Sequence, residues 1–517
     1  MDTLGSAESL YTRLCGHRDP YLQRARDASK LTIPMILPDE GHTSSSKLPT
    51  PYQSVGARGV NNLSSALLLS LLPPNSPFFR LVVDQTALNE IEAQGGGEAL
   101  KTEIESSLAK IERAVMSEIE TQALRVHTFE ALRHLIVTGN ALLHLPEGGG
   151  MRVIHLDRFV IERDPMGNPT TIITKECISP QALPKEAREL ASQKLDPSSK
   201  EGVVDLYTCV KTLEDGKIRI FQEVGGGVVP GSEGTFDADK SPYIALRMNR
   251  AAGEDYGRGY VEQYIGDLKS LESLMMSIVE AAAAASKILF LVAPNGGTRP
   301  RVLAEAPNGA IVEGSAADVS VLQLQKAADF GIAYQTVQTI SDRLSYAFLL
   351  TDNAIRNADR VTAAEVRLVT QSIERQLGGI YSVLSQEFQM PLVKRLMDQM
   401  QRDDRLPKIP SDLVRPAIIT GIEALGRGND LNKMDEFLVG VGQLLGPEVL
   451  GQYVDFREYM DRRAAALGID TDGLIKSEEE IQAAMQQQAL LNAAQQFGPQ
   501  MMESMTKQNV EGMKQGV

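Results

Sequence analysis

The sequence contains no tryptophan, and aromatic residues make up only 5% of its 517 positions. Modules that bind single-stranded nucleic acid stack the bases on aromatic side chains, so this scarcity argues against such a module. Positive charge is also limited, because 52 Lys and Arg residues stand against 67 Asp and Glu residues, which gives a net charge of −15. DNA-binding domains usually cluster Lys and Arg to attract phosphates. Any contact that this chain makes with DNA should therefore be sparse.

Cysteine is rare as well. Cys15, Cys177 and Cys209 lie far apart and are odd in number, which indicates no disulfide framework and a reducing compartment. Neither paired cysteines nor a His-Glu-x-x-His motif is present, so we expect no metal site. There is no signal-peptide pattern, and the most apolar run, 281–292, contains Lys287 and is too short to span a bilayer. We expect a soluble chain that is made in the cytoplasm and has no membrane partner.

Motifs for catalysis are lacking too. The sequence has no P-loop and no Gly-x-Ser-x-Gly elbow, and Gly257-Arg-Gly259 is only a fragment of a dinucleotide fingerprint. The acidic residues are scattered, without a paired-carboxylate pattern. We therefore expect no catalytic site, no cofactor and no enzymatic activity.

What the sequence does contain is a long helical segment that begins near Tyr260. Apolar or small residues recur there at alternating spacings of three and four, which is typical of a helix that packs along another helix. They are Val261, Tyr264, Leu268, Leu271, Met275, Ile278, Ala282 and Ala285. At about 1.5 Å per residue, this helix should form a rod of roughly 40 Å.

The pattern then changes to short β-type runs and returns to helix. Helical spacing resumes after Asp329, a polar loop follows at 351–361, and a capping box from Thr362 to Glu365 starts a third helix. The expected strands of the insert are 288–292, 310–312 and 319–324. A β unit of about 40 residues buries too little apolar surface to stand alone. Either several copies of the chain pack side by side, or the segment is a helical hairpin with a β tip inside an ordinary domain.

The flanking regions complete a fold of class α+β that is mainly α. The expected helices before the segment that begins near Tyr260 are 9–28, 59–72, 98–122 and 128–138, with a helical insert at 180–194. The expected strands are 78–83, 153–162, 170–178, 203–213, 217–224 and 244–248. After it, a helix over 362–402 should bend at Gly378-Gly379 and at Pro391, and short helices should fill 420–470.

Several stretches, in this order, resemble the portal proteins, or head-to-tail connectors, of bacteriophages, and more narrowly those of short-tailed podoviruses with a single-subunit RNA polymerase. They cover most of the chain from near residue 50 to near residue 475. The matching stretches are Tyr52–Leu63, Phe129–Asn140, Tyr256–Tyr260, Gly266–Glu272, Arg360–Arg367, Leu377–Gln386 and Thr420–Gly428.

The resemblance implies a portal fold with wing, stem, clip, tunnel loop and helical crown, assembled as a ring around an axial channel. The implied parts are a wing at 1–258 (helical over 1–145, β-rich over 146–250), stem helices at 259–287 and 329–350, a clip at 288–328, a tunnel loop at 351–361, a long wing or crown helix at 362–402, a crown at 403–475, and a C-terminal helix and tail at 476–517.

The resemblance also implies the function and the partners. A dodecameric ring of this chain would sit at one capsid vertex of the virion, where it serves genome packaging, head–tail joining and DNA ejection. Its partners would be double-stranded DNA bound without sequence preference, the terminase large subunit, a tail adaptor protein, and the scaffolding and major capsid proteins, with internal core proteins as a further option. The alternatives are a cellular helical ring or scaffold without a DNA role, and an enzyme, which the missing motifs disfavour.

The implied site residues are all polar or basic. In portals the loop that matches 351–361 projects into the channel, so its side chains become candidate DNA contacts. The candidate channel contacts are Asn353, Arg356, Asn357, Arg360 and Lys287, and the candidate contacts to the adaptor or terminase are Arg299 and Arg301. From the residues alone, a solvated turn and ordinary surface charges explain the same pattern. Four acids on the first rod, Glu262, Asp267, Glu272 and Glu280, either repel DNA from the bore or form a solvated helix face.

Overall fold

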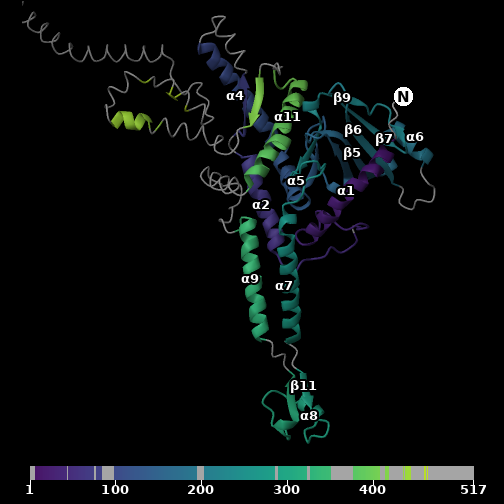
Figure 1. Ribbon diagram of the computed structural model, residues 1–517, viewed down its shortest axis with the longest axis vertical. Helices are drawn as coiled ribbons and strands as arrows, with labels where there is room; N and C mark the ends of the chain where they lie inside the picture. Colours follow the sequence, from purple (N-terminus) through teal and green to yellow (C-terminus); the bar gives the residue numbers. More distant parts are fainter. Residues whose placement is uncertain are drawn as a thin grey trace, which may run out of the picture. The chain divides into compact units, whose positions relative to one another are not determined.

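A computed structural model describes residues 6–43, 45–74, 77–83, 98–194, 203–285, 289–322, 327–350, 377–407 and 414–418, together with 435, 437–443, 454, 459–460 and 463. The chain divides into two compact units, Met1–Ala424 and Leu425–Val517. All of the helices and strands named below belong to the first unit, which mixes the two as the α+β class requires (Figure 1). No helix among the described residues is both long and apolar enough to cross a membrane.

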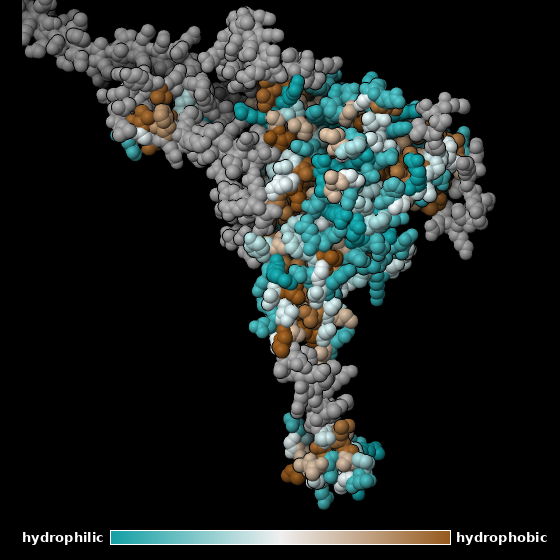
Figure 2. Space-filling view, viewed as in Figure 1, coloured by the Kyte–Doolittle hydropathy of each residue, from teal (hydrophilic) through white to brown (hydrophobic). Residues whose placement is uncertain are grey.

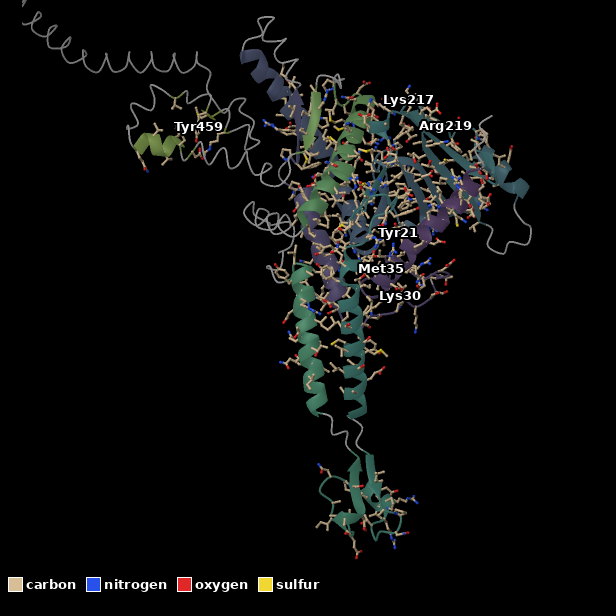
Figure 3. All side chains as sticks on the ribbon, viewed as in Figure 1. Tyr21, Lys30, Met35, Lys217, Arg219 and Tyr459 are labelled. Atoms are coloured by element: carbon tan, nitrogen blue, oxygen red, sulfur yellow. The ribbon has the colours of Figure 1, made fainter. Side chains whose placement is uncertain are left out.

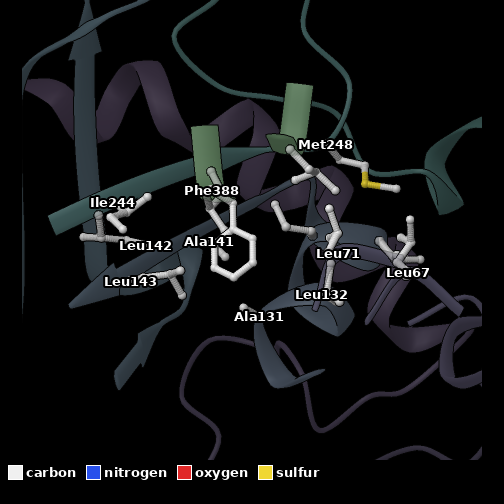
Figure 4. Close-up of a cluster of buried hydrophobic side chains, with 14 of the residues drawn as sticks. Leu67, Leu71, Ala131, Leu132, Ala141, Leu142, Leu143, Ile244, Met248 and Phe388 are labelled. Atoms are coloured by element: carbon white, nitrogen blue, oxygen red, sulfur yellow. The ribbon is translucent and has the colours of Figure 1, made fainter. Parts of the chain in front are cut away.

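Helix α2 (Val55–Leu71) is the centre of the main core. Its sequence is apolar on several faces, and ten of its residues are buried, including Val60, Leu63 and Leu67. It packs on α5 (Leu124–Thr138) and on α9 (Ala327–Ala347), while α1 (Ala7–Lys30) and α4 (Glu98–Thr121) contact α5. Figure 4 shows Leu67 and Leu71 of α2 beside Ala131 and Leu132 of α5 in this core. The buried helix that the sequence predicts at 59–72 is therefore present and begins one turn earlier.

A three-stranded antiparallel sheet follows α5 directly. Its order is β10-β2-β3, formed by Tyr243–Arg247, Asn140–His144 and Arg152–Ile154. The four residues Asn140 to Leu143 are all buried, because the main core lies against this short strand. This sheet therefore joins the helical core to the β-rich region.

A larger antiparallel sheet contains β4 to β9. Its order is β4-β5-β6-β7-β8, with β9 also paired to β7. The strands are Phe159–Arg163, Pro169–Ile178, Val204–Thr212, Ile218–Val224, Gly227–Val228 and Gly234–Phe236. Helix α1 covers one face, where Tyr11 and Leu14 lie in one cluster with Val160, Ile173 and Cys209. The other face joins the main core, and α6 (Lys185–Lys194) covers one end. Both hairpins expected from the turns at 164–168 and 214–216 are present.

Strand β1 (Phe79–Val83) has a partner that the sequence does not reveal. It pairs antiparallel with β13 (Val414–Ile418), so that Leu81 lies opposite Pro416. Proline is tolerated in an edge strand because one side of such a strand has no ladder partner. The two-stranded ribbon thus joins segments more than 300 residues apart.

The long helix expected over 362–402 is described from residue 377 onward. It is regular over 377–384, contains a π-helical turn at Ser385–Gln389, and continues as α11 (Met390–Arg402). The π-helical turn lies directly before Pro391, where a bend is expected, since proline lacks an N–H group and its ring crowds the carbonyl four residues earlier. Gly378 and Gly379 lie within the helical residues 377–384, and the bend expected there stays a prediction. The earlier part of this helix and most of 420–470 lie outside the described residues.

Helix α5 offers a matched test of the core. Leu135 is fully buried, whereas Val126 on the same helix is 67% exposed. We expect Leu135→Ala to lower the free energy of unfolding by about 2–5 kcal/mol, because it leaves a cavity in a packed core. Val126→Ala should change it by less than about 0.5 kcal/mol. Urea unfolding followed by circular dichroism measures both, and equal effects of the two substitutions would contradict this core.

Candidate functional site: a helix pair, its socket and a β unit

Two helices pack along each other in the segment that begins near Tyr260. Helix α7 (Ile265–Ala285) follows a 3₁₀ turn at Val261–Tyr264 and contacts α9. Leu268 and Leu271 of α7 and Ile340 and Leu344 of α9 are buried, as the alternating spacing predicts. The two helices therefore agree with the pattern in the sequence, and two of the three strands expected between them are present.

The start of α2 holds the bases of both helices. The carboxylate of Glu272 on α7 accepts hydrogen bonds from the backbone N–H of Tyr52 at 2.9 Å and of Gln53 at 3.2 Å. On the α9 side, Asn62 Nδ2 donates to the carbonyls of Phe348 at 3.1 Å and Leu349 at 3.0 Å. The stretch Tyr52–Leu63 is thus a socket that receives one helix at each end. The sequence singled out Glu272 only as one of four acids on the first rod and did not single out Asn62, so the resemblance of the surrounding stretches alone pointed to this place.

Gly59 explains why this socket fits closely. A Cβ atom at this helical position would lie 2.5 Å from Cγ of Phe348, whose side chain is fully buried. Only a residue without a side chain permits α2 and the end of α9 to approach this closely. The contact fixes the distance between the core and the helix pair.

A second backbone contact fixes the start of α7. The side chain of Asn140 accepts from the N–H of Gly257 at 2.8 Å and donates to the carbonyl of the same residue at 2.8 Å. Cβ atoms at Gly139 and Gly259 would lie 2.5 Å or less from backbone atoms of the opposite segment. The stretches Phe129–Asn140 and Tyr256–Tyr260 therefore pack backbone against backbone, with no side chain between them at these glycines.

Tyrosines link this junction to α9 and to α1. The hydroxyl of Tyr260 donates to the carbonyl of Ala347 at 2.9 Å, and its ring lies 5.8 Å from the ring of Phe348. Burial, and then the hydrogen bond with Tyr264, raise the pKa of Tyr260, so it stays a neutral donor. Tyr21 on α1, labelled in Figure 3, packs its ring 5.2 Å from that of Tyr256.

The end of α9 is held in an uncommon conformation. Leu349 has a φ of 59°, in the left-handed region that costs a residue with a side chain about 1–2 kcal/mol. The N–H of Leu350 bonds back to the carbonyl of Ser345 at 2.8 Å, which closes the helix. Burial of Leu349 and the Asn62 bond to its carbonyl offset the strain. The end of the helix at Leu349 and Leu350 is therefore fixed.

Three of the four acids on the first helix are engaged within the chain. Glu262 pairs with Arg24 at 3.3 Å, and Asp267 pairs with Arg343 of α9 at 2.7 Å. Glu272 accepts the two backbone N–H groups of the socket, and Glu280 is exposed. Most of these carboxylates therefore bind the helix to neighbouring segments of the same chain. The sequence pattern did not reveal these intramolecular contacts.

The β unit between the two helices is small and open. Strands β11 (Leu289–Val292) and β12 (Val319–Leu322) form an antiparallel pair, and the short helix α8 (Pro300–Glu305) was not expected. Thr298 donates through its N–H and its hydroxyl to the Asp318 carboxylate at 3.2 and 3.1 Å. The strand predicted at 310–312 is wrong, because these residues are irregular and Ile311 is fully exposed. Within 291–320, Thr298 is the one residue described as buried.

The predicted site residues divide into two groups. Arg299 occupies the N-cap position of α8 and is exposed, and Arg301 is exposed with an ion pair to Glu305 at 3.1 Å. These two thus lie together on the β unit, where their predicted role stays a prediction. Lys287, Asn353, Arg356, Asn357 and Arg360 lie outside the described residues.

Large apolar side chains remain exposed on the helix pair away from its seam. Met276 and Val279 of α7 are 41% and 46% exposed, and Ile332, Tyr334 and Tyr346 of α9 are 64–68% exposed. Figure 2 shows hydrophobic residues along this pair. Exposed apolar patches of this kind mark surfaces that another protein covers.

The socket yields a test with a control in the same chain. We expect Gly59→Ala to lower the unfolding free energy by about 1–3 kcal/mol, because the new methyl group overpacks against Phe348. Gly16→Ala, in helix α1 with nothing within 4 Å of the added atom, should stabilise by about 0.5–1 kcal/mol. Thermal unfolding measures the stability of both variants. A Gly59→Ala variant as stable as the wild type would contradict the close packing of the socket.

Comparison with known proteins identifies the family to which the chain belongs. The family model described as "Bacteriophage head to tail connecting protein" matches residues 4–475. The portal protein of Escherichia phage T7 is 40% identical over 490 residues, which cover 94% of this chain and 90% of that protein. The portal protein of Enterobacteria phage T3 is 40% identical over 488 residues, covering 93% and 90%.

A less similar relative and one solved structure were also found. The portal protein of Enterobacteria phage SP6 is 30% identical over 494 residues, covering 93% of this chain and 92% of that protein. A chain from the neck of the native GTA particle, computed with C12 symmetry, aligns with a TM-score of 0.34 and 12% identity over 80% of this chain and 90% of that chain. On the strength of the family model and the relatives that match nearly its whole length, this chain belongs to the bacteriophage head to tail connecting proteins.

Proposed function

We propose that copies of this chain assemble into a ring-shaped channel at one vertex of a phage capsid. Double-stranded DNA would enter the head through this channel during packaging and leave through it at ejection. The observation that carries the proposal is the exposed apolar surface on both sides of the helix pair, formed by Met276, Val279, Ile332, Tyr334 and Tyr346. In a head-to-tail connector, the natural occupant of such a surface is the next copy of the same chain.

A ring would cover two surfaces that a single copy leaves exposed: the apolar outer faces of the helix pair and the small β unit. A pair of helices with apolar residues on its outer faces packs side by side with identical pairs, and a heterologous contact repeated around an axis closes into a ring. The β unit with one buried residue between 291 and 320, and with open strand edges, gains partners in the same way. We propose twelve copies, the number that the resemblance to portals implies. The rival reading, a cellular scaffold, has no comparable support from the relatives.

The channel would hold DNA weakly. A net charge of −15 repels the phosphate backbone, which favours passage over tight binding. The loop 351–361 follows directly on the fixed end of α9 at Leu349 and Leu350. We propose that Arg356 and Arg360 touch phosphates there, with Asn353, Asn357 and Lys287 nearby, and that they read no base.

The β unit would face the other proteins of the vertex. Arg299 and Arg301 are exposed on it, Arg301 in an ion pair with Glu305, so both are accessible to acidic groups of a tail adaptor or of the packaging terminase. The ATP hydrolysis that drives packaging would come from that terminase, while this chain contributes the closed passage. The names wing, stem, clip and crown, with the boundaries stated above, remain part of this proposal.

Ring formation is tested on the outer face of α9. We expect the double substitution Ile332→Glu with Tyr346→Glu to reduce the fraction of rings by about tenfold or more, because it places charge in a contact that must lose its water. Electron microscopy and light scattering of the purified protein measure that fraction. Gln23→Glu, an exposed position on helix α1 away from the helix pair, is the control and should still form rings. A wild-type protein that stays monomeric would refute the proposal.

The loop assignment has a separate test. Arg356→Glu combined with Arg360→Glu should leave rings intact but lower the amount of packaged DNA several-fold, because the loop would then repel phosphates. Reversing two exposed cations elsewhere, Arg13→Glu with Lys185→Glu, is the control for charge alone. Quantitative PCR of DNA protected inside heads gives the readout. Normal genome filling in the loop variant would contradict the assignment.

A further inference from the structure

A pocket of about 450 Å³ lies apart from the helix pair, on the β-rich side of the first unit. It is lined by the turn between β4 and β5, by β10, and by the junction of the π-helical turn with α11. Ile172, Val210 and Ile218 line it and belong to the main core, whereas Val160, Ile173 and Cys209 of the same sheet pack with α1. The pocket therefore opens on the face of the sheet opposite to α1.

Three guanidinium groups converge on the turn at the edge of this pocket. Arg163 Nη1 and Arg247 Nη2 both donate to the carbonyl of Gly167, at 2.8 and 3.3 Å. Arg250 Nη2 donates to the neighbouring carbonyl of Met166 at 3.4 Å. A Cβ atom at Gly167 would lie 3.0 Å from Nη2 of Arg247 and 3.1 Å from Nη2 of Arg250. Like charges are thus held close together over a single glycine.

The carboxylates of the pocket do not balance these cations. Its lining contains Arg163, Arg247, Arg250 and Lys394, four positive groups, against Asp239 and Glu387, two negative groups, which leaves an excess of two positive charges. Lys394 pairs with Asp239 at 3.3 Å. Asp255, just outside the lining, accepts from the backbone N–H of Arg163. Such an excess is unusual in a chain whose net charge is −15.

The pKa of Arg163 shows the effect of this excess of positive charge. Its three side-chain donors all go to backbone carbonyls, namely those of Asp255, Gly167 and Ala245. Burial and the adjacent Arg247 lower the pKa of Arg163 to about 10. An added negative charge in the pocket would relieve both effects.

Glu387 shows how a carboxylate is recognised here. It accepts from the backbone N–H of Arg247 at 3.1 Å, from Nε at 3.1 Å and from Nη2 at 2.5 Å. Arg247 is only 3% exposed, so this pair is buried and satisfied. The exposed Arg250 and the partly exposed Lys394 have no equivalent partner of that quality, and they flank the mouth together with Met166, which is 78% exposed.

We propose that this pocket binds an oxyanion, a carboxylate or a phosphate group, which enters past Arg250 and Lys394. Either source supplies the same chemistry: free phosphate, or an acidic side chain of a protein that packs on this side of the molecule. The apolar lining from Ile172, Met390 and Pro391 favours a carboxylate carried on an aliphatic stem. A DNA duplex is too wide for a cavity of about 450 Å³, so the nucleic-acid backbone is not the ligand.

The test uses the full-length protein in its assembled form and two probes. Inorganic phosphate represents the free anion, and an acetylated, amidated tripeptide Ala-Glu-Ala represents the acidic side chain, each titrated by isothermal calorimetry at low salt. Arg250→Gln should weaken binding of the active probe about tenfold, since it removes one charge-assisted hydrogen bond. Arg13 is exposed on helix α1, which covers the opposite face of the sheet, so Arg13→Gln should leave binding unchanged.

Each outcome decides the proposal. Saturable binding of the peptide that Arg250→Gln weakens supports a protein partner as the source, and the same result with phosphate supports a free anion. Saturation with neither probe, or binding that Arg250→Gln and Arg13→Gln alter equally, means that the arginines only fasten the 164–168 turn, and this overturns the proposal. Because Arg250 is exposed, thermal unfolding should be the same for the variant and the wild type, and this excludes misfolding as the cause.

Discussion

The contact between Gly59 and Phe348 is the constraint on which the helix pair depends. It requires that two helices from distant parts of the sequence meet with no side chain between them on one side. The hydrogen bonds from Asn62 and the carboxylate of Glu272 then act at either end of the same short stretch. Because each of these interactions involves backbone, they set position more strictly than a contact between flexible side chains would.

The same logic recurs where Asn140 meets Gly257. A side-chain amide that accepts from the N–H and donates to the carbonyl of one residue behaves as a replacement for a strand partner, so the two segments are registered to a single residue. The three tyrosines near this junction then extend the fixed region to α1 and α9. A rigid base of this kind suits an element that must keep its place while a long polymer moves past it.

Much of this architecture was accessible from the sequence. Heptad-like spacing located α7 and α9, and turn composition located the β4–β5 and β6–β7 hairpins. Pro391 lies directly after the π-helical turn of the long helix. These signals are local, because periodicity and turn chemistry act over a few residues. The pairing of β1 with β13, the socket formed by Asn62 and Glu272, and the short helix α8 were not predictable, since each depends on tertiary contacts or on a weak local preference. Arg299 and Arg301 lie on one small unit and their role stays a prediction, whereas the pocket around Gly167 gave no sequence signal, because its arginines come from separate strands and loops.

The π-helical turn at Ser385–Gln389 carries a consequence for how the long helix presents its sides. Such a turn accommodates one residue more than an α-helical turn, so the faces before and after it are rotated relative to each other by roughly a quarter of a circle. Phe388 and Gln389 therefore both point inward at the step, where the Gln389 amide reaches the carbonyl of Leu71 at 2.6 Å. One continuous rod thereby serves two different neighbours, the α2 core on one side of the step and the arginine-rich sheet edge on the other, without a break in the chain.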